Sequence, residues 1–324
     1  MKVFVTGSTG LLGSNLVKSL LDGGFAVRAL VRDRQKAVTQ LPPEVEVVSG
    51  DLENIAQWSD QLQGCQAVVH CAAYFREYFG RGQHWQRLQK LNIEATMQLA
   101  QEALKHEIRR FVHISSSGTI GEGGNEDSPP GPEAEDNLYF KSKVLTDERL
   151  KTWPHAQEIG LVTVLPGWMF GPMDAAPTGS GRLIRDFLAG KLMAVPPGGA
   201  SLVDARDVAS AIVHLLRQEP AHNRYIVAGS TVSLAEIVQL LAKISGRPAP
   251  KIHLPYGLAL VVAWLMELAS RVTGRDPLVT RVAVRTMARQ RRLSSQRAQH
   301  ELKVRFRPLE ETLRDSLVWQ QSRA

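Results

Sequence analysis

The sequence has little cysteine, no internal repeat and no long hydrophobic run. Its 324 residues include two cysteines, Cys65 and Cys71, so a framework of disulfide bonds is excluded as the source of stability. The first residues enter a strand-like stretch without the apolar segment of a secretory signal peptide. The most apolar later stretch, 258–268, contains Glu267 and is shorter than the ~20 residues that span a bilayer. We therefore expect a cytosolic protein with no transmembrane segment, in which 258–268 is a core or packing helix, with contact to a membrane surface as the alternative.

Positive charge is concentrated near the carboxyl terminus. Residues 271–314 contain twelve Lys and Arg against four Asp and Glu, an excess of +8, whereas the whole chain carries +7. Such a segment can attract nucleic acid, anionic lipid or a phosphorylated ligand. Because no interleaved aromatic residues or nucleic-acid motif accompany it, we expect a solvated basic face and no nucleic-acid partner.

A glycine-rich turn connects an apolar strand to a helix at the start of the chain. The sequence of 6–13 is Thr-Gly-Ser-Thr-Gly-Leu-Leu-Gly, and a helix-like stretch follows. Gly7 permits a tight turn, Gly10 lets the backbone approach a pyrophosphate, and Gly13 lets the helix pack closely on its strand. The order of strand, turn and helix favours a dinucleotide site over a purely structural loop. The expected contacts are Gly7, Thr9, Gly10, Leu11, Leu12 and Gly13.

A tyrosine and a lysine lie four residues apart in a second helix-like segment. With Asp136 as the expected helix cap, Tyr139 and Lys143 share one helix face. A nearby ammonium favours the phenolate of a tyrosine, whose free pKa is ~10, and so prepares it to exchange a proton at working pH. Considered alone, an exposed surface pair is the alternative.

Between these two motifs, an apolar run ends in hydroxyl groups. Residues 110–114 are Arg-Phe-Val-His-Ile, and three serines and Gly118 follow. Ligands of doubly wound sheets bind beyond the carboxyl ends of the strands. We therefore expect Ser117, or failing it Ser116, to donate a hydrogen bond to a substrate carbonyl, with a turn or cap serine as the alternative.

Strand-like runs alternate with helical patterns along the chain. The runs are 3–6, 27–31, 45–49, 67–71, 110–115 and 161–165, and a late strand follows at 224–228. The alternation predicts the α/β class, with a Rossmann-type doubly wound parallel sheet and a smaller, mostly helical substrate domain. The expected boundaries are a dinucleotide-binding domain of 1–170, to which 203–230 return, and a substrate-binding domain of 171–202 and 231–324. Gly and Pro clusters around Phe187 predict a mobile loop region over 172–200.

These motifs together resemble the extended short-chain dehydrogenase/reductases, also called the NAD-dependent epimerase/dehydratase family, over most of the chain. The resemblance rests on the glycine turn, the serine-rich strand end and Tyr139-x-x-Ser142-Lys143. It implies a catalytic trio of Ser117, Tyr139 and Lys143. Residues 27–33 are similar to the dihydroflavonol reductase branch, which uses NADPH. In one departure from the family, Leu165 replaces an arginine, so no role of that arginine is carried over.

The resemblance implies further contacts with the cofactor. They are Asp51, Leu52, Cys71, Ala72, Ala73, Asn92, Pro166 and Gly167, besides the glycine turn, Tyr139 and Lys143. Aromatic residues after the fourth strand and in the loop after 166 indicate an apolar pocket, or packing between the domains. The candidate substrate contacts are Tyr74, Ser117, Trp168 and Phe170.

The end of the second strand bears on the choice of cofactor. An acidic residue there binds the ribose hydroxyls of NAD, whereas an arginine accommodates the extra phosphate of NADP. Arg32 and Asp33 compete for this place. An ungapped comparison aligns the acid of NAD-using members with Val31, and Arg34 adds positive charge. We expect contact with Arg32 and therefore NADP, with NAD as the alternative.

Three functions remain open from the sequence. The first is a carbonyl reductase of the dihydroflavonol or hydroxysteroid type, in which Tyr139 exchanges the proton. The second is a nucleotide-sugar epimerase or dehydratase, which the lack of asparagine in 166–172 disfavours. The third is a non-catalytic NADP sensor, which intact Tyr139 and Lys143 disfavour. The family commonly pairs through two helices, here 137–151 and 85–104, so we expect a homodimer; we expect no metal.

Overall fold

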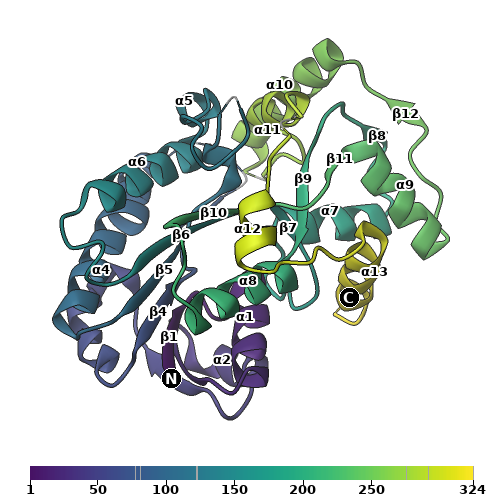
Figure 1. The fold of residues 1–324 in the computed structure, drawn as a ribbon. Coiled ribbons are helices and arrows are strands. Elements are labelled where there is room, and N and C mark those ends of the chain that lie inside the picture. Colours follow the sequence, from purple (N-terminus) through teal and green to yellow (C-terminus); the bar gives the residue numbers. More distant parts are fainter. Residues whose placement is uncertain (77, 81, 122, 275, 291, 324) are drawn as a thin grey trace.

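The computed structural model describes residues 1–76, 78–80, 82–121, 123–274, 276–290 and 292–323. At its centre is a seven-stranded parallel sheet with the strand order β10-β6-β5-β4-β1-β2-β3 (Figure 1). The strands are β1 (Lys2–Thr6), β2 (Ala26–Val31), β3 (Glu46–Ser49), β4 (Ala67–His70), β5 (Arg110–Ile114), β6 (Leu161–Pro166) and β10 (Arg224–Val227). The predicted doubly wound sheet is confirmed.

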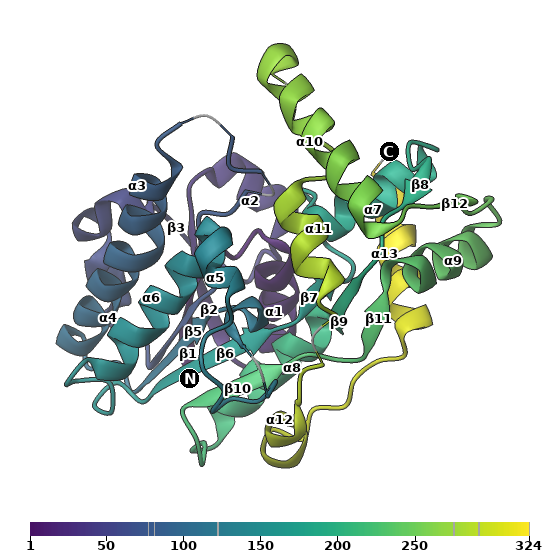
Figure 2. The ribbon, with the colours of Figure 1, turned by 90° about the horizontal axis from the view of Figure 1, so that it is seen from above.

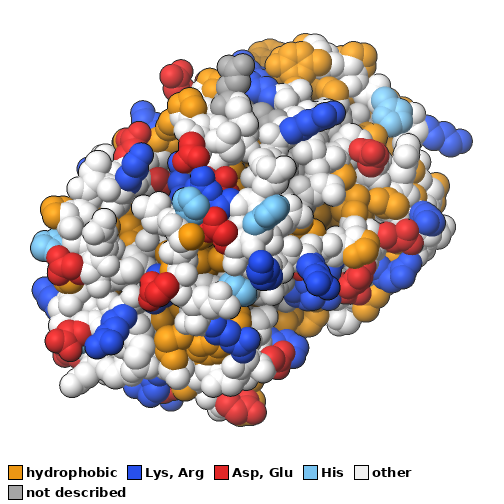
Figure 3. All heavy atoms as spheres, in the orientation of Figure 1, with side chains coloured by type: hydrophobic (Ala, Val, Ile, Leu, Met, Phe, Trp, Pro, Cys, Tyr) orange, Lys and Arg blue, Asp and Glu red, His pale blue; other side chains and the backbone are white. Residues whose placement is uncertain are grey.

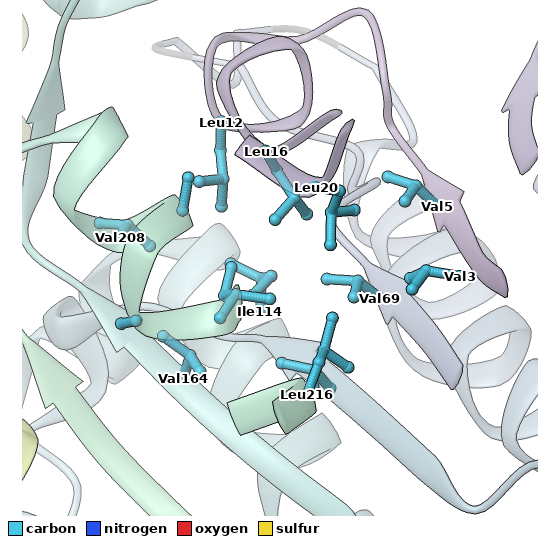
Figure 4. Packing of buried hydrophobic residues seen from close by; sticks show 14 of the residues in the cluster. Val3, Val5, Leu12, Leu16, Leu20, Val69, Ile114, Val164, Val208 and Leu216 are labelled. Carbon is cyan, nitrogen blue, oxygen red and sulfur yellow. The ribbon is translucent and has the colours of Figure 1, made fainter. Parts of the chain in front are cut away.

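Helices cover both faces of this sheet because alternate strand residues point to opposite sides. On β1, Val3 and Val5 pack against α1 (Leu11–Asp22) and α8 (Ala205–Arg217), as Figure 4 shows. Phe4 points the other way, toward α4 (Ala95–Lys105) and α6 (Leu138–Thr152). Shorter helical pieces complete these layers: α2 (Arg34–Gln40), η1 (Leu52–Gln57), η2 (Ser59–Leu62), α3 (His84–Leu88), η3 (Gln89–Glu94), η4 (Ser117–Thr119) and α5 (Glu133–Asp136).

A smaller unit lies beside the carboxyl ends of the central strands. Its three-stranded sheet contains β7 (Trp168–Phe170), β9 (Gly199–Asp204) and β11 (Thr231–Ser233), and its two-stranded sheet contains β8 (Ala194–Val195) and β12 (Ile252–His253). Its helices are α7 (Gly179–Leu188), α9 (Leu234–Ser245), α10 (Tyr256–Thr273), α11 (Arg281–Ala288) and α13 (Leu309–Gln321). The remaining helix, α12 (Gln296–Glu301), packs against β10.

The structure differs from the sequence expectations in two parts of this smaller unit. The region expected to be a mobile loop contains α7, because Ile184 and Phe187 are spaced as on one helix face and are both buried in the core of the unit. Near the carboxyl terminus, Ala298, Leu302 and Val304 pack into the core of the central sheet. The chain therefore returns to the central sheet a second time, after residue 295.

Of the two expectations for 258–268, a core or a packing helix, the structure shows a packing helix, α10, which lies against α11. Its buried residues are Ala259, Ala263 and Glu267, while its large apolar side chains are exposed. In the part of the chain that is described, α10 is the one helix whose length and composition would suffice to cross a membrane. It projects from the body of the protein (Figure 2).

Candidate active site

A cavity of about 1020 Å³ lies between the carboxyl ends of the central strands and the helices α10 and α11. The residues that line this cavity come from turns that are far apart in the sequence. The predicted site residues that line it are Gly7, Gly10, Leu11, Leu12, Gly13, Cys71, Ala73, Ser117, Tyr139, Gly167 and Trp168. Parallel strands present their carboxyl ends at one edge, which is why these residues meet.

The glycine turn has the geometry that the sequence predicts for a dinucleotide cradle. Gly7 has φ +68°, and a Cβ there would lie 2.7 Å from the backbone nitrogen of Ala72. A Cβ on Gly13 would lie 2.0 Å from the carbonyl oxygen of Gly7. Gly10 caps α1 with extended backbone and borders the cavity. The amino end of α1 therefore faces open space, where a pyrophosphate fits.

The residues expected to surround the adenosine lie along the same sheet edge but outside this cavity. Arg32 is exposed directly after β2, and Asp51 and Leu52 follow β3, its neighbour in the sheet. The Asp51 carboxylate accepts a hydrogen bond from the backbone nitrogen of Glu53 at 2.9 Å, so it caps η1. This placement leaves the Arg32 guanidinium accessible to a phosphate.

Tyr139 enters the cavity from the first turn of α6. Asn137 caps this helix by accepting hydrogen bonds from the backbone nitrogens of Tyr139 and Phe140, at 3.0 and 3.3 Å. Asp136, the cap expected from the sequence, ends α5 instead. A Cβ on Gly118 would lie 2.2 Å from the Phe140 ring, so only glycine lets α6 approach the end of β5 this closely.

Lys143 lies one turn later on α6 and is buried. Its Nζ donates a hydrogen bond to the carbonyl oxygen of Ile114 at 2.7 Å and is 5.8 Å from the centre of the Tyr139 ring. Burial lowers the pKa of Lys143 to about 8, although the negative charge of Asp147 opposes this shift. Burial also raises the pKa of Asp147 to about 6, against the hydrogen bond that Ser115 donates to it at 2.7 Å.

Two serines after β5 border the cavity, and their hydroxyls have different roles. The Ser116 hydroxyl accepts a hydrogen bond from the backbone nitrogen of Gly118 at 3.1 Å. The Ser117 hydroxyl has no hydrogen-bond partner among the residues that the structure describes. Of the two, Ser117 therefore has the hydroxyl that is available to a ligand; its role as donor stays a prediction.

Asn92 is a positioning residue and not a wall of the cavity. It is buried on η3, and its side-chain oxygen accepts from the backbone nitrogen of Tyr74 at 2.7 Å. Its amide donates to the carbonyl oxygen of Tyr74 and to the Ser142 hydroxyl, both at 3.0 Å. These bonds connect the loop after β4 to α6. The cofactor contact expected for Asn92 stays a prediction, although both donors of its amide are used inside the protein.

Several other expected contacts also lie outside the cavity. The Tyr74 hydroxyl is 3.0 Å from Nδ1 of His84. Phe170 is 1% exposed and packs edge-on against Trp168, with ring centres 4.8 Å apart, so it supports a wall residue from behind. Phe170, expected to contact the substrate, thus lies in the core of the smaller unit and not on the cavity wall. The remaining residues outside the lining are Thr9, Ala72, Lys143 and Pro166.

The structure adds wall residues that are not among the predicted site residues. The ring of Phe75 stands edge-on to Tyr139, with centres 4.8 Å apart. The opposite wall comes from α10 and α11 and includes Arg271, Arg281 and Arg285. These arginines belong to the basic segment 271–314, but only tertiary folding brings them to the cavity. At the position of the missing family arginine, Leu165 is packed among aliphatic side chains.

Comparison with known proteins agrees with this geometry. The profile of the NAD dependent epimerase/dehydratase family matches residues 3–229. A putative dihydroflavonol 4-reductase from Synechocystis is 34% identical, covering 98% of this chain and 94% of that protein. Sterol demethylase protein B from Methylococcus capsulatus is 30% identical over 98% of each chain.

A solved structure shows the same fold over the whole chain. UDP-glucuronic acid 4-epimerase from Bacillus cereus, in complex with UDP-glucuronic acid and NAD, has a TM-score of 0.79 at 21% identity, covering 100% of both chains. The similarity of fold, the profile match and the two relatives point to one conclusion. This chain belongs to the NAD-dependent epimerase/dehydratase family and is an enzyme of the extended short-chain dehydrogenase/reductase type.

Proposed function

We propose that the protein is an NADP-dependent oxidoreductase acting on the carbonyl or alcohol group of an apolar substrate. The observation that carries this proposal is the meeting of Ser117 and Tyr139 on one cavity wall, above buried Lys143 and beside the glycine turn. Apolar side chains form much of the remaining lining; they include Phe75, Phe79, Phe140, Trp168 and Met169. One relative is named for sterol demethylation, which is chemistry on a large apolar molecule.

Each catalytic side chain has a distinct part in this proposal. NADP, when bound, supplies or accepts the hydride. The Tyr139 hydroxyl donates a proton to the substrate oxygen during reduction and takes it back during oxidation. Ser117 donates a hydrogen bond that holds the same oxygen in place. The buried ammonium of Lys143 favours the phenolate of Tyr139 over the phenol and thereby eases proton release.

One observation favours a second candidate function, conversion of a nucleotide sugar. Arg271, Arg281 and Arg285 line the wall opposite the glycine turn, and guanidinium groups suit phosphate oxygens. Of these, Arg281 already binds the Glu267 carboxylate at 2.8 Å. A nucleoside diphosphate would have to share this wall with an ion pair.

A substrate panel separates the candidates. Purified protein is mixed with NADPH and aromatic, alicyclic or steroid-like ketones, and in parallel with a set of nucleotide sugars. We expect NADPH oxidation with ketones only. Conversion of a nucleotide sugar without net use of NADPH would replace the reductase by an epimerase. Tight NADPH binding without any turnover would instead favour a sensor.

We also propose that NADPH binds more tightly than NADH, because Arg32 is exposed where the 2′-phosphate is expected. Arg32→Ser should weaken NADPH binding by about tenfold or more and leave NADH binding nearly unchanged, since a charge-assisted hydrogen bond contributes roughly 1.5–3 kcal/mol. Calorimetric titration of both cofactors measures this.

Arg109→Ser is the matched control for Arg32→Ser. Arg109 is also exposed, but it directly precedes β5 and so lies at the amino ends of the strands, away from the cavity. Its replacement should change neither affinity. Equal binding of the two cofactors to the unmodified protein would show that Asp33 controls the ribose pocket.

A homodimer is the proposed assembly, paired through α6 and the helical stretch of α3, η3 and α4. These helices contact one another, and Figures 1 and 2 both show α4 and α6 side by side on one face of the sheet. Light scattering at micromolar concentration should give twice the chain mass of 35.7 kDa. A mass of one chain would contradict the dimer.

A further inference from the structure

Helix α10 has the reverse of the usual distribution of apolar side chains. Ala259, Ala263 and Glu267 recur every four residues and form its buried stripe against α11. Glu267 anchors this stripe by accepting hydrogen bonds from the backbone nitrogen and Nε of Arg281, at 2.7 and 2.8 Å. The large apolar side chains occupy the outer stripe: Leu258, Val261, Trp264, Leu265, Leu268 and Val272. Their spacing of three and four places them on one helix face.

This outer stripe is the centre of an extended hydrophobic patch. Its six side chains are 44–85% exposed, and Ile252, Tyr256 and Leu278 extend the patch at both ends of the helix. Among the described residues, nine of fourteen exposed large hydrophobic side chains thus lie between 252 and 278, so the patch is local and not a general property of the surface. Figure 3 shows hydrophobic atoms gathered at the top of the molecule, over α10. Contiguous exposed patches of this kind mark contact sites for proteins or membranes.

The charge around the patch indicates what covers it. Residues 247–292 contain nine Lys and Arg against two Asp and Glu, a net charge of +7 that equals the net charge of the whole chain. Both acids are already paired, Glu267 with Arg281 and Asp276 with Arg76 at 3.5 Å. Exposed basic side chains that remain on this segment are Arg247, Lys251, Arg271, Arg285 and Arg292. An anionic surface would complement them.

We propose that α10 docks the protein on the surface of an anionic phospholipid bilayer. Leu and Trp on the outer stripe would enter the boundary between headgroups and acyl chains, and the flanking arginines would meet lipid phosphates. Trp264 and Tyr256 suit this interface, since their rings combine an apolar body with a polar tip. The helix lies on the membrane and does not cross it, because its inner stripe is held to α11 by the Glu267–Arg281 pair.

A second copy of the chain fits the patch less well. Two copies that met through α10 would bring two segments of charge +7 together, and juxtaposed like charges oppose association.

Docking also has a consequence for catalysis, which rests on the proposed function. Arg271 and Arg285 line the cavity, so docking would place one wall of the cavity beside the bilayer, where an apolar substrate is dissolved.

Vesicle co-sedimentation of the full chain tests the docking. The probes are vesicles of phosphatidylcholine with and without phosphatidylglycerol, at low and raised salt. We expect binding to the anionic vesicles, weaker binding at raised salt, and little binding to the neutral ones. The triple variant Leu258→Gln, Leu265→Gln, Val272→Gln should bind anionic vesicles at least about tenfold more weakly, given the transfer free energy of three large apolar side chains.

A matched triple variant shows whether the effect belongs to α10. Val38→Gln, Met193→Gln and Val318→Gln replace side chains that are 58–78% exposed on other elements. Vesicle binding of this control should equal that of the unmodified protein. Calorimetric NADPH binding should be the same for all three proteins, which shows that each is folded.

Three results would overturn the proposal: no binding to anionic vesicles at low salt, equal loss in both triple variants, or a smaller oligomer for the α10 variant in the absence of lipid. The last result would make the stripe an interface between copies. Reduction of a water-soluble ketone should be unchanged in the α10 variant. Failure of docking is therefore distinguishable from failure of the proposed reductase function.

Discussion

Replacing Tyr139 by phenylalanine is expected to lower turnover by about 10²–10⁴-fold, the range typical for loss of general acid–base catalysis. The substitution removes one oxygen and leaves the ring, so the edge-on contact with Phe75 at 4.8 Å between ring centres is retained. NADPH affinity should therefore survive. Stopped-flow rates at saturating substrate and calorimetric NADPH titration measure the two effects separately.

The matched control is Tyr78→Phe, since Tyr78 is another tyrosine that lines the same cavity. Its turnover should stay within about threefold of the unmodified enzyme, because it is not placed with Ser117 and Lys143. An authentic activity that persists unchanged in Tyr139→Phe would refute the proton-transfer mechanism. A loss in both variants of equal size would indicate that the hydroxyls only shape the cavity.

Lys143→Met should impair both turnover and cofactor binding. The buried ammonium favours the phenolate of Tyr139, and we expect it to hold a ribose hydroxyl, so its removal affects chemistry and NADPH affinity together. The fold should persist, because methionine fills a similar volume and no longer requires a charge to be buried. Circular dichroism checks the fold, and the titrations above measure affinity. Unchanged NADPH affinity would remove the proposed ribose contact.

The pKa of Lys143 also predicts the pH dependence. Because burial lowers this pKa from 10.5 to about 8, kcat/KM should fall as pH rises through about 8 and the ammonium is lost. The fold responds with the opposite sign: between about 8 and 10.5 the unfolded chain binds the proton and the folded chain does not, so the contribution of Lys143 to stability rises with pH.

Asp147→Asn is the variant that tests this assignment. The negative charge of Asp147 raises the pKa of Lys143, so its removal should move the alkaline limb of the kcat/KM profile to lower pH. Glu148→Gln is the control, because Glu148 is the exposed neighbour on the same helix and does not contribute to the Lys143 shift. If the alkaline limb of the kcat/KM profile stays at the same pH in Asp147→Asn, a group other than Lys143 is responsible for that limb.

Local stereochemistry made much of the site predictable from sequence. The left-handed φ of Gly7 and the close contact at Gly13 are requirements of a short turn, so spacing alone reveals them. Tyr139 and Lys143 share a face because a helix brings residues four apart together. The observed helix cap is Asn137, one residue after the predicted cap Asp136. Helix boundaries depend on which side chain reaches the free backbone nitrogens, and spacing does not reveal this.

Roles that depend on distant partners were not predictable in this way. Asn92 was expected to touch the cofactor, and the structure adds hydrogen bonds of its side chain to Tyr74 and Ser142, which are 18 and 50 residues away in the chain. Phe170 was expected at the substrate, but α7 covers it, and the glycines of that segment concealed a helix. Burial is a property of the assembled layers, so a run of aromatic residues does not show which ring faces the cavity.

The sequence by itself determined the order of strands and helices, the stereochemistry of the glycine turn and the shared helix face of Tyr139 and Lys143, because each depends on backbone stereochemistry or on the period of one helix or strand. Only the tertiary structure decided the far wall of the cavity and the surroundings of α10. The apolar residues of 258–268 are equally compatible with a buried helix and an exposed one. The orientation of α10 follows from Ala259 and Ala263, because their small side chains pack against α11 and leave the larger apolar side chains on the outer face.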